Sequence, residues 1–367
     1  MKPYIANSLP LENLDYKRLF KLVGDANAAL ARYDGLLQGI INPEILLSPL
    51  TTQEAVLSSK IEGTQATLDE VLEYDAGIAM DTEKTQDIQE ITNYRKALML
   101  SKDLMPERPI TLPLIREMHK ILMNSVRGKD KNPGEFRKDQ NWIGRPGCLM
   151  EEATFVPVSP FELINNLEQW AQYAKGDDMD AIMQLSIIHA QFELIHPFKD
   201  GNGRLGRLLI PLFLYQKKKL ASPMFYLSSY LEKNRDHYYD SLKRISADND
   251  WNQWIEFFLN AVKLQAIENS KKVHRIMALY DKMKHSITEV THSQFSIRIL
   301  DELFSNPIFR TTDFITKTGI NKQTALSLIQ KIKEAGHLTL LKEASGRRPA
   351  VFMFKELLNI TEGKDML

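Results

Sequence analysis

The pattern of apolar and polar positions along the chain is mainly helical. Residues 182–195 are so uniformly apolar that they predict a helix buried at the centre of a bundle rather than a surface helix. Pro197 and the glycines at 201 and 203 are expected to end this helix. Further helical patterns occur at Leu114–Val126, Pro160–Ala174, Leu205–Gln216, Asn234–Arg244 and Trp251–Arg275.

Strand signals are few. Within residues 141–158, Gly144, Pro146 and Gly147 separate short β-prone pieces, which predicts a hairpin or an irregular flap. From about Ser293 the pattern changes to short helices followed by two strands around a turn. That order is typical of a winged helix. The elements expected there are helices at Ile297–Phe304, Thr311–Thr318 and Lys322–Ala335 and strands at Leu338–Lys342 and Ala350–Lys355.

Composition excludes several classes of protein. Of the 367 residues, 43% are hydrophobic and 26% are charged, so the chain is neither disordered nor collagen-like. Its net charge of zero gives no global field for nucleic acid or anionic lipid, and such a partner would need a local patch. Cys148 is the single cysteine, no apolar run reaches 18 residues, and the first ten residues do not resemble a signal peptide. We therefore expect a cytoplasmic protein.

The stretch from His196 to Arg207 carries the candidate chemistry. It reads His-Pro-Phe-Lys-Asp-Gly-Asn-Gly-Arg-Leu-Gly-Arg. The Gly-Asn-Gly loop lets backbone amides approach a ligand, and a helix that begins near Arg204 directs its positive end into the same space. Arg204 and Arg207, one turn apart, suit the capture of phosphate oxygens, and Asp200 offers a carboxylate to a hard cation. These residues predict a nucleoside triphosphate site with His196 as proton acceptor.

Fragments of this stretch have simpler interpretations. His-Pro is often only a helix stop, and Gly-Asn-Gly is often only a turn. A turn requires neither the carboxylate of Asp200 nor two arginines, so the complete stretch favours a binding site. His189 is expected to be a buried helix residue rather than a ligand, and no Walker or dinucleotide-binding glycine pattern is present.

Residues 196–207 resemble the signature of the Fic family, His-Pro-Phe-x-Asp/Glu-Gly-Asn-Gly-Arg-x-x-Arg, at every fixed position. Members of this family typically transfer AMP from ATP to a protein hydroxyl, so the resemblance implies a protein adenylyltransferase with ATP as substrate and Mg²⁺ as metal. It implies that His196 deprotonates the Ser, Thr or Tyr of a target protein or of the chain itself, and that Asp200 holds Mg²⁺. The implied cradle for the phosphates consists of Gly201, Asn202, Gly203, Arg204 and Arg207.

Two further stretches extend the resemblance. The family has a flap upstream of the signature that holds the target chain extended, and here Ile143 and Gly144 occupy it. Downstream, residues 229–239 resemble the segment that encloses the adenine, with Tyr239 as the candidate aromatic contact. Core packing is an equally good interpretation of each tyrosine in that segment.

An inhibitory helix is also expected in the N-terminal region. Thr51 is expected to cap a helix that Gly63 ends, and Ser58 and Glu62, four residues apart, share one face of it. The spacing Ser-x-x-x-Glu-Gly resembles the inhibitory motif of Fic proteins, which implies that Glu62 pairs with Arg207 and denies it to the γ-phosphate. In the alternative interpretation Glu62 meets only water at a solvated helix end.

The C-terminal region is expected to contact DNA or protein. Residues 291–367 contain 11 Lys and Arg against 8 Asp and Glu, a modest positive balance. Residues 322–324 open the candidate recognition helix, and Arg347 and Arg348 lie at the tip of the wing, in reach of a phosphate backbone.

The whole chain is therefore expected to be mainly α: a Fic-type helical bundle with a small β-hairpin flap and a C-terminal winged-helix domain. A homodimer through the apolar N-terminal third is possible, and no membrane contact is expected. Two alternatives to AMP transfer stay open: an ATP-sensing DNA-binding regulator, and a Fic enzyme that uses another donor or removes AMP. The expected regions are 1–105 with the inhibitory helix, the catalytic core at 106–260, a helical connector at 261–290 and the winged helix at 291–367.

Overall fold

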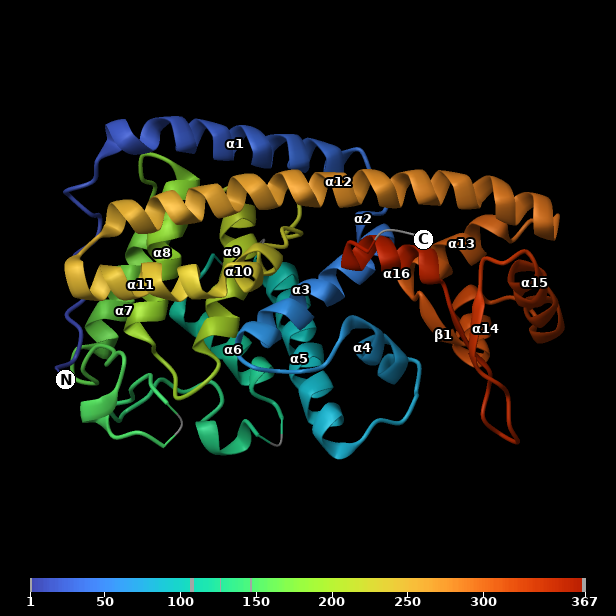
Figure 1. The fold of residues 1–367 in the computed structure, drawn as a ribbon, viewed down its shortest axis with the longest axis horizontal. Helices are drawn as coiled ribbons and strands as arrows, with labels where there is room; N and C mark the ends of the chain where they lie inside the picture. The colour runs from blue at the N-terminus through green and yellow to red at the C-terminus, as the bar shows by residue number, and fades with distance from the viewer. Residues whose placement is uncertain (1, 106–108, 126, 146, 365–367) are drawn as a thin grey trace. The chain divides into compact units, whose positions relative to one another are not determined.

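The computed structural model describes residues 2–105, 109–125, 127–145 and 147–364, which form two compact units. Helices α1, α3, α5 and α12 contribute residues to both units (Figure 1). No helix in these ranges is long and apolar enough to cross a membrane. Unit 1 consists of Met1–Gly35, Leu57–Thr64 and Gln89–Ile267, and unit 2 of Leu36–Val56, Gln65–Ile88 and Glu268–Leu367.

Unit 1 is a bundle of helices, as the sequence predicts. The apolar segment at its centre is α8 (Ala181–Ile195), which is buried along almost its whole length and packs against α7 and α9. Asp180 caps the start of α8 by accepting hydrogen bonds from the amides of Ile182 and Met183, both at 2.9 Å. The other helices with residues in this unit are α1 (Tyr16–Gln38), α3 (Ser48–Ile61), α5 (Thr82–Leu104), α6 (Leu112–Leu122), α7 (Leu163–Lys175), α9 (Asn202–Gln216), α10 (Ser228–Lys233), α11 (Arg235–Asp248), α12 (Trp251–Thr291) and the single 3₁₀ turns η1 (Lys129–Lys131) and η2 (Met150–Glu152).

Two helix starts differ from the sequence prediction. Helix α3 begins at Ser48, so Thr51 lies inside the helix and does not cap it, and the carbonyl of Leu47 accepts the amide of Thr51 at 3.3 Å. The signal for the earlier start is Pro49, a residue favoured in the first turn of a helix. Helix α9 begins at Asn202 rather than near residue 204 because the chain has already turned at residue 201.

Other boundaries shift by a few residues. Helix α6 ends at Leu122, short of the expected Val126, which lies outside the described residues. Helix α7 begins at Leu163 rather than at residue 160, and α12 continues without interruption to Thr291. In the flap at 141–158 the described residues form one isolated antiparallel bridge, Ile143 with Phe155, rather than a longer hairpin, and Pro146 lies outside the described residues.

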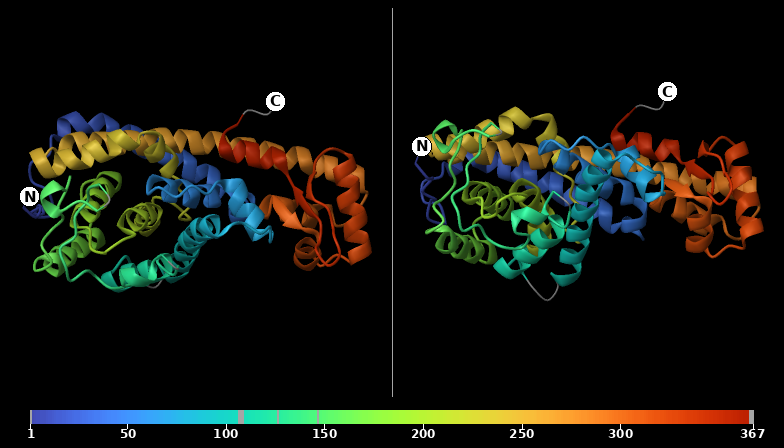
Figure 2. Two further views of the ribbon diagram at one scale, coloured as in Figure 1. Left: turned by 60° about the horizontal axis from the view of Figure 1, so that its bottom comes forward. Right: turned by 90° about the horizontal axis from the view of Figure 1, so that it is seen from below.

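Unit 2 contains the C-terminal module, residues 291–364. Its elements follow the order helix, strand, helix, helix, strand, strand, helix and are drawn in orange to red in Figure 2. Its three strands form an antiparallel sheet of order β1-β3-β2. The first strand was not expected, because three residues are too few to show an alternating pattern, and the last helix was not expected either. The elements are α13 (Ser296–Ser305), β1 (Ile308–Arg310), α14 (Thr311–Thr318), α15 (Lys322–Glu334), β2 (Thr339–Lys342), β3 (Val351–Met353) and α16 (Lys355–Glu362).

The core of this module is apolar and aromatic. Phe309 pairs in register with Phe352, with 6.0 Å between ring centroids, and Phe314 lies 5.1 Å from Phe309. Earlier parts of the chain complete unit 2, with α4 packed against β1 and α2 packed against α13. These two short helices are α2 (Pro43–Leu46) and α4 (Leu68–Asp75).

Candidate functional site

His196 stands at the sharp turn between α8 and α9. Its backbone is left-handed, with φ +51° and ψ +64°, a conformation that residues other than glycine seldom adopt. The guanidinium of Arg137, itself 3% exposed, supports this turn by donating from Nε to the carbonyl of His196 at 2.9 Å and from Nη2 to that of Ile195 at 3.3 Å. Arg137 therefore stabilises the strained backbone at His196, and the sequence alone did not indicate this role.

The imidazole of His196 is arranged as a proton acceptor. Its Nδ1 lies 3.2 Å from the carbonyl oxygen of Glu193, which can only accept, so Nδ1 carries the proton and Nε2 is left without one. Burial lowers the pKa of His196 to about 4, and the ring is therefore neutral near pH 7. A neutral imidazole with an unprotonated Nε2 is able to take a proton from an alcohol.

The Gly-Asn-Gly loop is fixed by its own asparagine. The side-chain oxygen of Asn202 accepts from the amide of Phe198 at 2.8 Å, and its nitrogen donates to the carbonyl of Phe198 at 2.9 Å. Gly201 has a φ of +77°, and a β-carbon placed on Gly203 would lie 2.1 Å from Oε1 of Glu62. The start of α9 thus presents bare backbone, as an anion-binding helix start requires.

Both arginines of the signature are buried and held by carboxylates. Arg207 donates from Nη2 to Oε1 of Glu62 at 2.7 Å, and from Nε and Nη2 to the hydroxyl and carbonyl of Ser58 at 3.0 and 2.8 Å. Arg204 donates from Nη1 to Glu90 at 2.6 Å, and its buried Nε contacts no acceptor in the described part of the chain. Ser58 and Glu62 therefore contact Arg207. Glu90, which contacts Arg204, is a further residue of the site and has no sequence signal of its own.

Glu62 is ionised in this arrangement. Burial disfavours its charged form, but the charge of Arg207 and the hydrogen bond from it outweigh burial, so the pKa of Glu62 lies below its ordinary value. Helix α3 ends at Ile61, and Glu62 and Gly63 form the turn that follows, with Gly63 at φ +103°. Glu62 is therefore presented from a helix end rather than from within the helix.

Asp200 has the properties of a ligand for a hard cation. Its side chain is 46% exposed, and its Oδ1 accepts from the amide of Gly201 at 2.5 Å and lies 3.4 Å from Nη2 of Arg204. No group of three or more His, Cys, Asp or Glu that could hold a metal is found among the described residues. One carboxylate suits Mg²⁺ bound jointly with a nucleotide, because Mg²⁺ usually keeps waters and takes its remaining oxygens from phosphate.

Glu193 is a further carboxyl at the site that sequence reasoning missed. Burial raises its pKa to about 8, against the opposing charge of Arg207, so it is largely protonated at neutral pH. Its Oε1 has no hydrogen-bond partner in the described chain and would lie 2.3 Å from a β-carbon on Gly206. A glutamate inside an otherwise apolar helix, three residues before His196, is a signal that could have found it.

The tyrosines after α10 divide into a core residue and a surface residue. Tyr238 is 1% exposed, and its hydroxyl lies 2.9 Å from Nε2 of His189, so both residues belong to the core. Tyr239 is 41% exposed, and the guanidinium carbon of Arg235 lies 5.7 Å from the centre of its ring. Partial burial, and then the charge of Glu62, raise the pKa of Tyr239 to about 12.

The flap is tied to the signature. Asn141 donates from its side chain to the carbonyl of Phe198 at 3.1 Å, and Arg137 donates to the carbonyls of Asp139 and Val158 at the two ends of the flap. The amide and carbonyl of Ile143 both pair with Phe155, so an added strand would have to use the neighbours of Ile143, such as Gly144.

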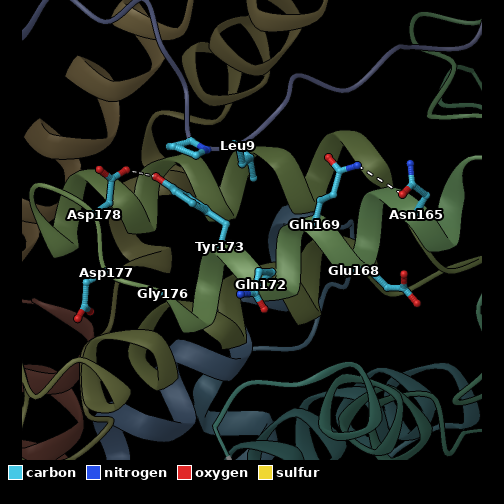
Figure 3. A pocket seen from close by; sticks show the side chains of 10 residues that line it. Leu9, Asn165, Glu168, Gln169, Gln172, Tyr173, Gly176, Asp177 and Asp178 are labelled. Carbon is cyan, nitrogen blue, oxygen red and sulfur yellow. Dashed lines mark hydrogen bonds between the residues drawn. The ribbon is translucent and has the colours of Figure 1, made fainter.

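A separate hollow of about 590 Å³ lies against α7 in unit 1 (Figure 3). It is lined by acidic and amide side chains, including Glu168, Asp177 and Asp178, and Tyr173 donates a short hydrogen bond to Asp178. No residue of the signature lines this hollow, so the candidate site is not part of it.

Fold and site together define a helical protein in which a neutral imidazole lies beside a helix start with two buried arginines. Family models described as "Fic/DOC family N-terminal" and "Fic/DOC family" match residues 20–102 and 109–214. The chain belongs to the Fic/DOC family.

Named relatives and solved structures agree with this membership. The chain is 27% identical over 208 residues to a probable protein adenylyltransferase of Aquifex aeolicus, which covers 54% of this chain and 56% of that protein. It is 26% identical over 263 residues to the protein adenylyltransferase Fic of Drosophila grimshawi, which covers 69% and 47%. The chain thus spans about half the length of these curated relatives.

A crystal structure of a Fic family protein from Desulfovibrio desulfuricans superposes with a TM-score of 0.60 at 18% identity, covering 96% of this chain and 98% of that one. A Fic domain-containing signalling protein from Bacteroides thetaiotaomicron gives a TM-score of 0.53 at 20% identity, with 71% and 96% covered. These likenesses support the fold.

Proposed function

We propose that this protein transfers AMP from ATP to a hydroxyl of a protein substrate or of the chain itself. The observation that carries the proposal is the neutral imidazole of His196, with Nε2 unprotonated, next to a helix start with buried arginines. A protein that only senses ATP needs the phosphate-binding groups but does not need a histidine arranged to accept a proton. The curated relatives, which are named protein adenylyltransferases, support the same chemistry.

In this proposal His196 accepts the proton of a Ser, Thr or Tyr hydroxyl through Nε2 while the oxygen attacks the α-phosphorus of ATP. A bond forms between that oxygen and the phosphorus, the bond to the bridging oxygen breaks, and pyrophosphate leaves. The charge of the phosphates is stabilised by the backbone amides of Gly201 and Gly203 and by the guanidinium of Arg204. Mg²⁺, held by Asp200, would neutralise phosphate charge when bound.

The pair of Glu62 and Arg207 is proposed to restrain this activity. Arg207 is 1% exposed and its Nη2 is already bonded to Glu62 and Ser58, so it cannot bind the γ-phosphate while those contacts last. A charge-assisted hydrogen bond of this kind contributes roughly 1.5–3 kcal/mol, which corresponds to about ten- to hundredfold in occupancy of the free state. ATP bound without Arg207 would lack one of its phosphate contacts.

The test is to incubate wild type and Glu62→Gly with ATP labelled on the α-phosphate, in the presence of Mg²⁺, and to follow label in protein. We expect Glu62→Gly to label itself or a target at least tenfold faster. Lys60→Ala, in the last turn of the same helix and half exposed, is the matched control and is expected to behave as wild type. Equal labelling in wild type and Glu62→Gly would remove the restraint from the proposal.

The same experiment separates AMP transfer from its alternatives. AMP transfer is indicated if the protein takes up label from ATP labelled on the α-phosphate but not from ATP labelled on the γ-phosphate. The reverse result indicates phosphate transfer. Competition by unlabelled UTP, GTP and CTP tests the donor, and loss of AMP from modified protein tests removal. If no label from any nucleotide enters protein in the Glu62→Gly variant, the proposed activity is wrong.

A second function, DNA contact, is proposed for the C-terminal module, which we interpret as a winged helix. Its α15 presents Lys322, Gln323 and Thr324 as exposed residues at the N-terminus, where Asn321 caps the helix by accepting from the amide of Gln323 at 3.0 Å. The turn between β2 and β3 exposes two further arginines, at 347 and 348. We also retain, as a proposal, the division into regions 1–105, 106–260, 261–290 and 291–367.

A further inference from the structure

A histidine outside the signature contacts the loop that the proposed metal carboxylate occupies. His119, on α6, is fully buried. Its Nδ1 accepts from the amide of Gly134 at 2.8 Å, and its Nε2 lies 3.0 Å from the carbonyl oxygen of Asp200. Because Nδ1 accepts, it carries no proton, and the single proton of the neutral ring is on Nε2, which donates to Asp200. Both ring nitrogens of His119 therefore form hydrogen bonds in a single tautomer.

Packing holds this ring flat against the loop. His119 stacks on Phe198, with 3.7 Å between ring centroids and 9° between planes, and Phe198 is in turn bonded to Asn202 through both backbone groups. A β-carbon on Gly201 would lie 2.8 Å from the sulfur of Met123 and 3.6 Å from Nε2 of His119. Helix α6 thus lies directly against residues 198–202, with no room for a side chain between them.

The hydrogen bond from His119 determines how the Asp200 peptide is turned. The carbonyl of Asp200 is directed at the ring, and the N–H of the same peptide, that of Gly201, donates to Oδ1 of the half-exposed Asp200 carboxylate. If the peptide were free to rotate, the Asp200 carboxylate would lose the position that its bond to the Gly201 amide gives it.

We propose that His119 is a positioning residue, which orients the Asp200–Gly201 peptide for binding of Mg²⁺ and the phosphates of ATP. This inference rests on the proposed function. The group does not touch substrate; it acts through Asp200, as hydrogen-bond partners behind a metal ligand do elsewhere, where their loss costs about 10–100-fold in metal affinity.

Two substitutions separate positioning from packing. In His119→Gln the amide nitrogen reaches the place of Nε2 and keeps a donor for Asp200, whereas in His119→Asn the side-chain oxygen replaces Nδ1 and serves only Gly134. Met118→Leu, at the fully buried neighbouring position and nearly equal in volume, is the control for disturbance of α6. All three are made in the Glu62→Gly background so that Arg207 is free to bind phosphate.

The measurements are ATP affinity by calorimetry with and without Mg²⁺, thermal unfolding, and the kcat and KM of AMP transfer. In the parent, Mg²⁺ is expected to increase the affinity for ATP. In His119→Asn we expect this increase to be smaller by about tenfold or more, and the KM for ATP to be higher. His119→Gln is expected to stay within about threefold of its parent, although it loses the Gly134 bond. Met118→Leu is expected to bind as the parent does.

Two results would overturn the proposal. The first is that His119→Asn binds Mg·ATP as tightly as the parent does. The second is that His119→Gln loses as much affinity for Mg·ATP as His119→Asn does. Binding is measured without turnover, so a parent that binds Mg·ATP but transfers no AMP refutes the proposed activity and leaves this test intact. If His119→Asn does not fold, the ¹⁵N spectrum of the unsubstituted histidine decides: a proton on Nδ1 contradicts the proposal, and a proton on Nε2 that shifts with Mg·ATP supports it.

Discussion

The signature turn, residues 196–207, and the C-terminal module, residues 291–364, bury polar groups in different ways. The turn buries two arginines and an asparagine, and it holds His196 and Gly201 in left-handed backbone. In the module two buried hydroxyls bond back to their own helices, that of Thr318 to Phe314 at 2.6 Å and that of Thr361 to Leu357 at 2.9 Å. The turn thus buries charged groups, which is costly for a fold, whereas these module hydroxyls satisfy their hydrogen bonds locally. Under the proposed function the buried groups of the turn serve a ligand.

The largest expected effect lies at the turn. In the Glu62→Gly background, His196→Asn is expected to lower the rate of AMP transfer by about 10²–10⁴-fold, because Asn lacks the Nε2 acceptor. Asn tolerates left-handed backbone, and its amide is able to replace Nδ1 as donor to Glu193. Labelling rates check this prediction, and ATP affinity and melting temperature near those of the parent serve as its control. Unchanged labelling would show that the imidazole of His196 is structural, like the hydroxyls of Thr318 and Thr361.

A second prediction concerns pH and compares Glu193, on α8 three residues before the turn, with a carboxyl of the module. Glu193 stays protonated in the folded chain up to about pH 8, but in the unfolded chain it ionises above its ordinary pKa of 4.5. Unfolding therefore releases a proton between these values, and rising pH favours the unfolded state there. Relative to Glu193→Gln, wild type is expected to lose roughly 2–4 kcal/mol of unfolding free energy from pH 5 to pH 8.

Glu302 of the module is the matched control for this pH effect. It is 9% exposed, and burial raises its pKa, but Asn306 bonds its Oε1 at 3.0 Å and Lys317 lies 3.7 Å away. We expect Glu302→Gln to change the pH dependence less than Glu193→Gln does. Denaturant unfolding of the three proteins at pH 5 and pH 8 measures both effects, and parallel curves for wild type and Glu193→Gln would contradict the prediction.

The smallest effect is expected at the wing of the module. Arg347→Ala with Arg348→Ala removes two exposed charges, so stability is expected to change by less than about 0.5 kcal/mol and AMP transfer not at all. If the module contacts duplex DNA, the double variant is expected to bind it more weakly at 50 mM salt and with a shallower salt dependence. Fluorescence anisotropy with the full chain measures this; identical binding curves would exclude these arginines from a DNA contact.

Sequence reasoning predicts the features of the site that are local in the chain. The loop glycines and the two arginines lie within twelve residues, and the apolar run that precedes them predicts α8. Glu90, His119 and Arg137 join the site from segments 59 or more residues away from their partners, and only tertiary packing brings them there. A local signal also competes with another: Thr51 has the chemistry of a helix cap, but Pro49 favours the first turn, and α3 begins at Ser48.

The contacts of Arg137 have one more consequence. Its guanidinium donates to the carbonyls of Ile195 and His196, where α8 ends and the turn begins, and to carbonyls next to the start and at the end of the flap. The side chain of Asn141 adds a second hydrogen bond to the loop. These hydrogen bonds connect the flap to the turn that carries the imidazole. If a target polypeptide lies along the flap edge, as the proposed function requires, the length of each side chain sets how far its hydroxyl reaches toward His196, and we expect the enzyme to distinguish Ser, Thr and Tyr by that length.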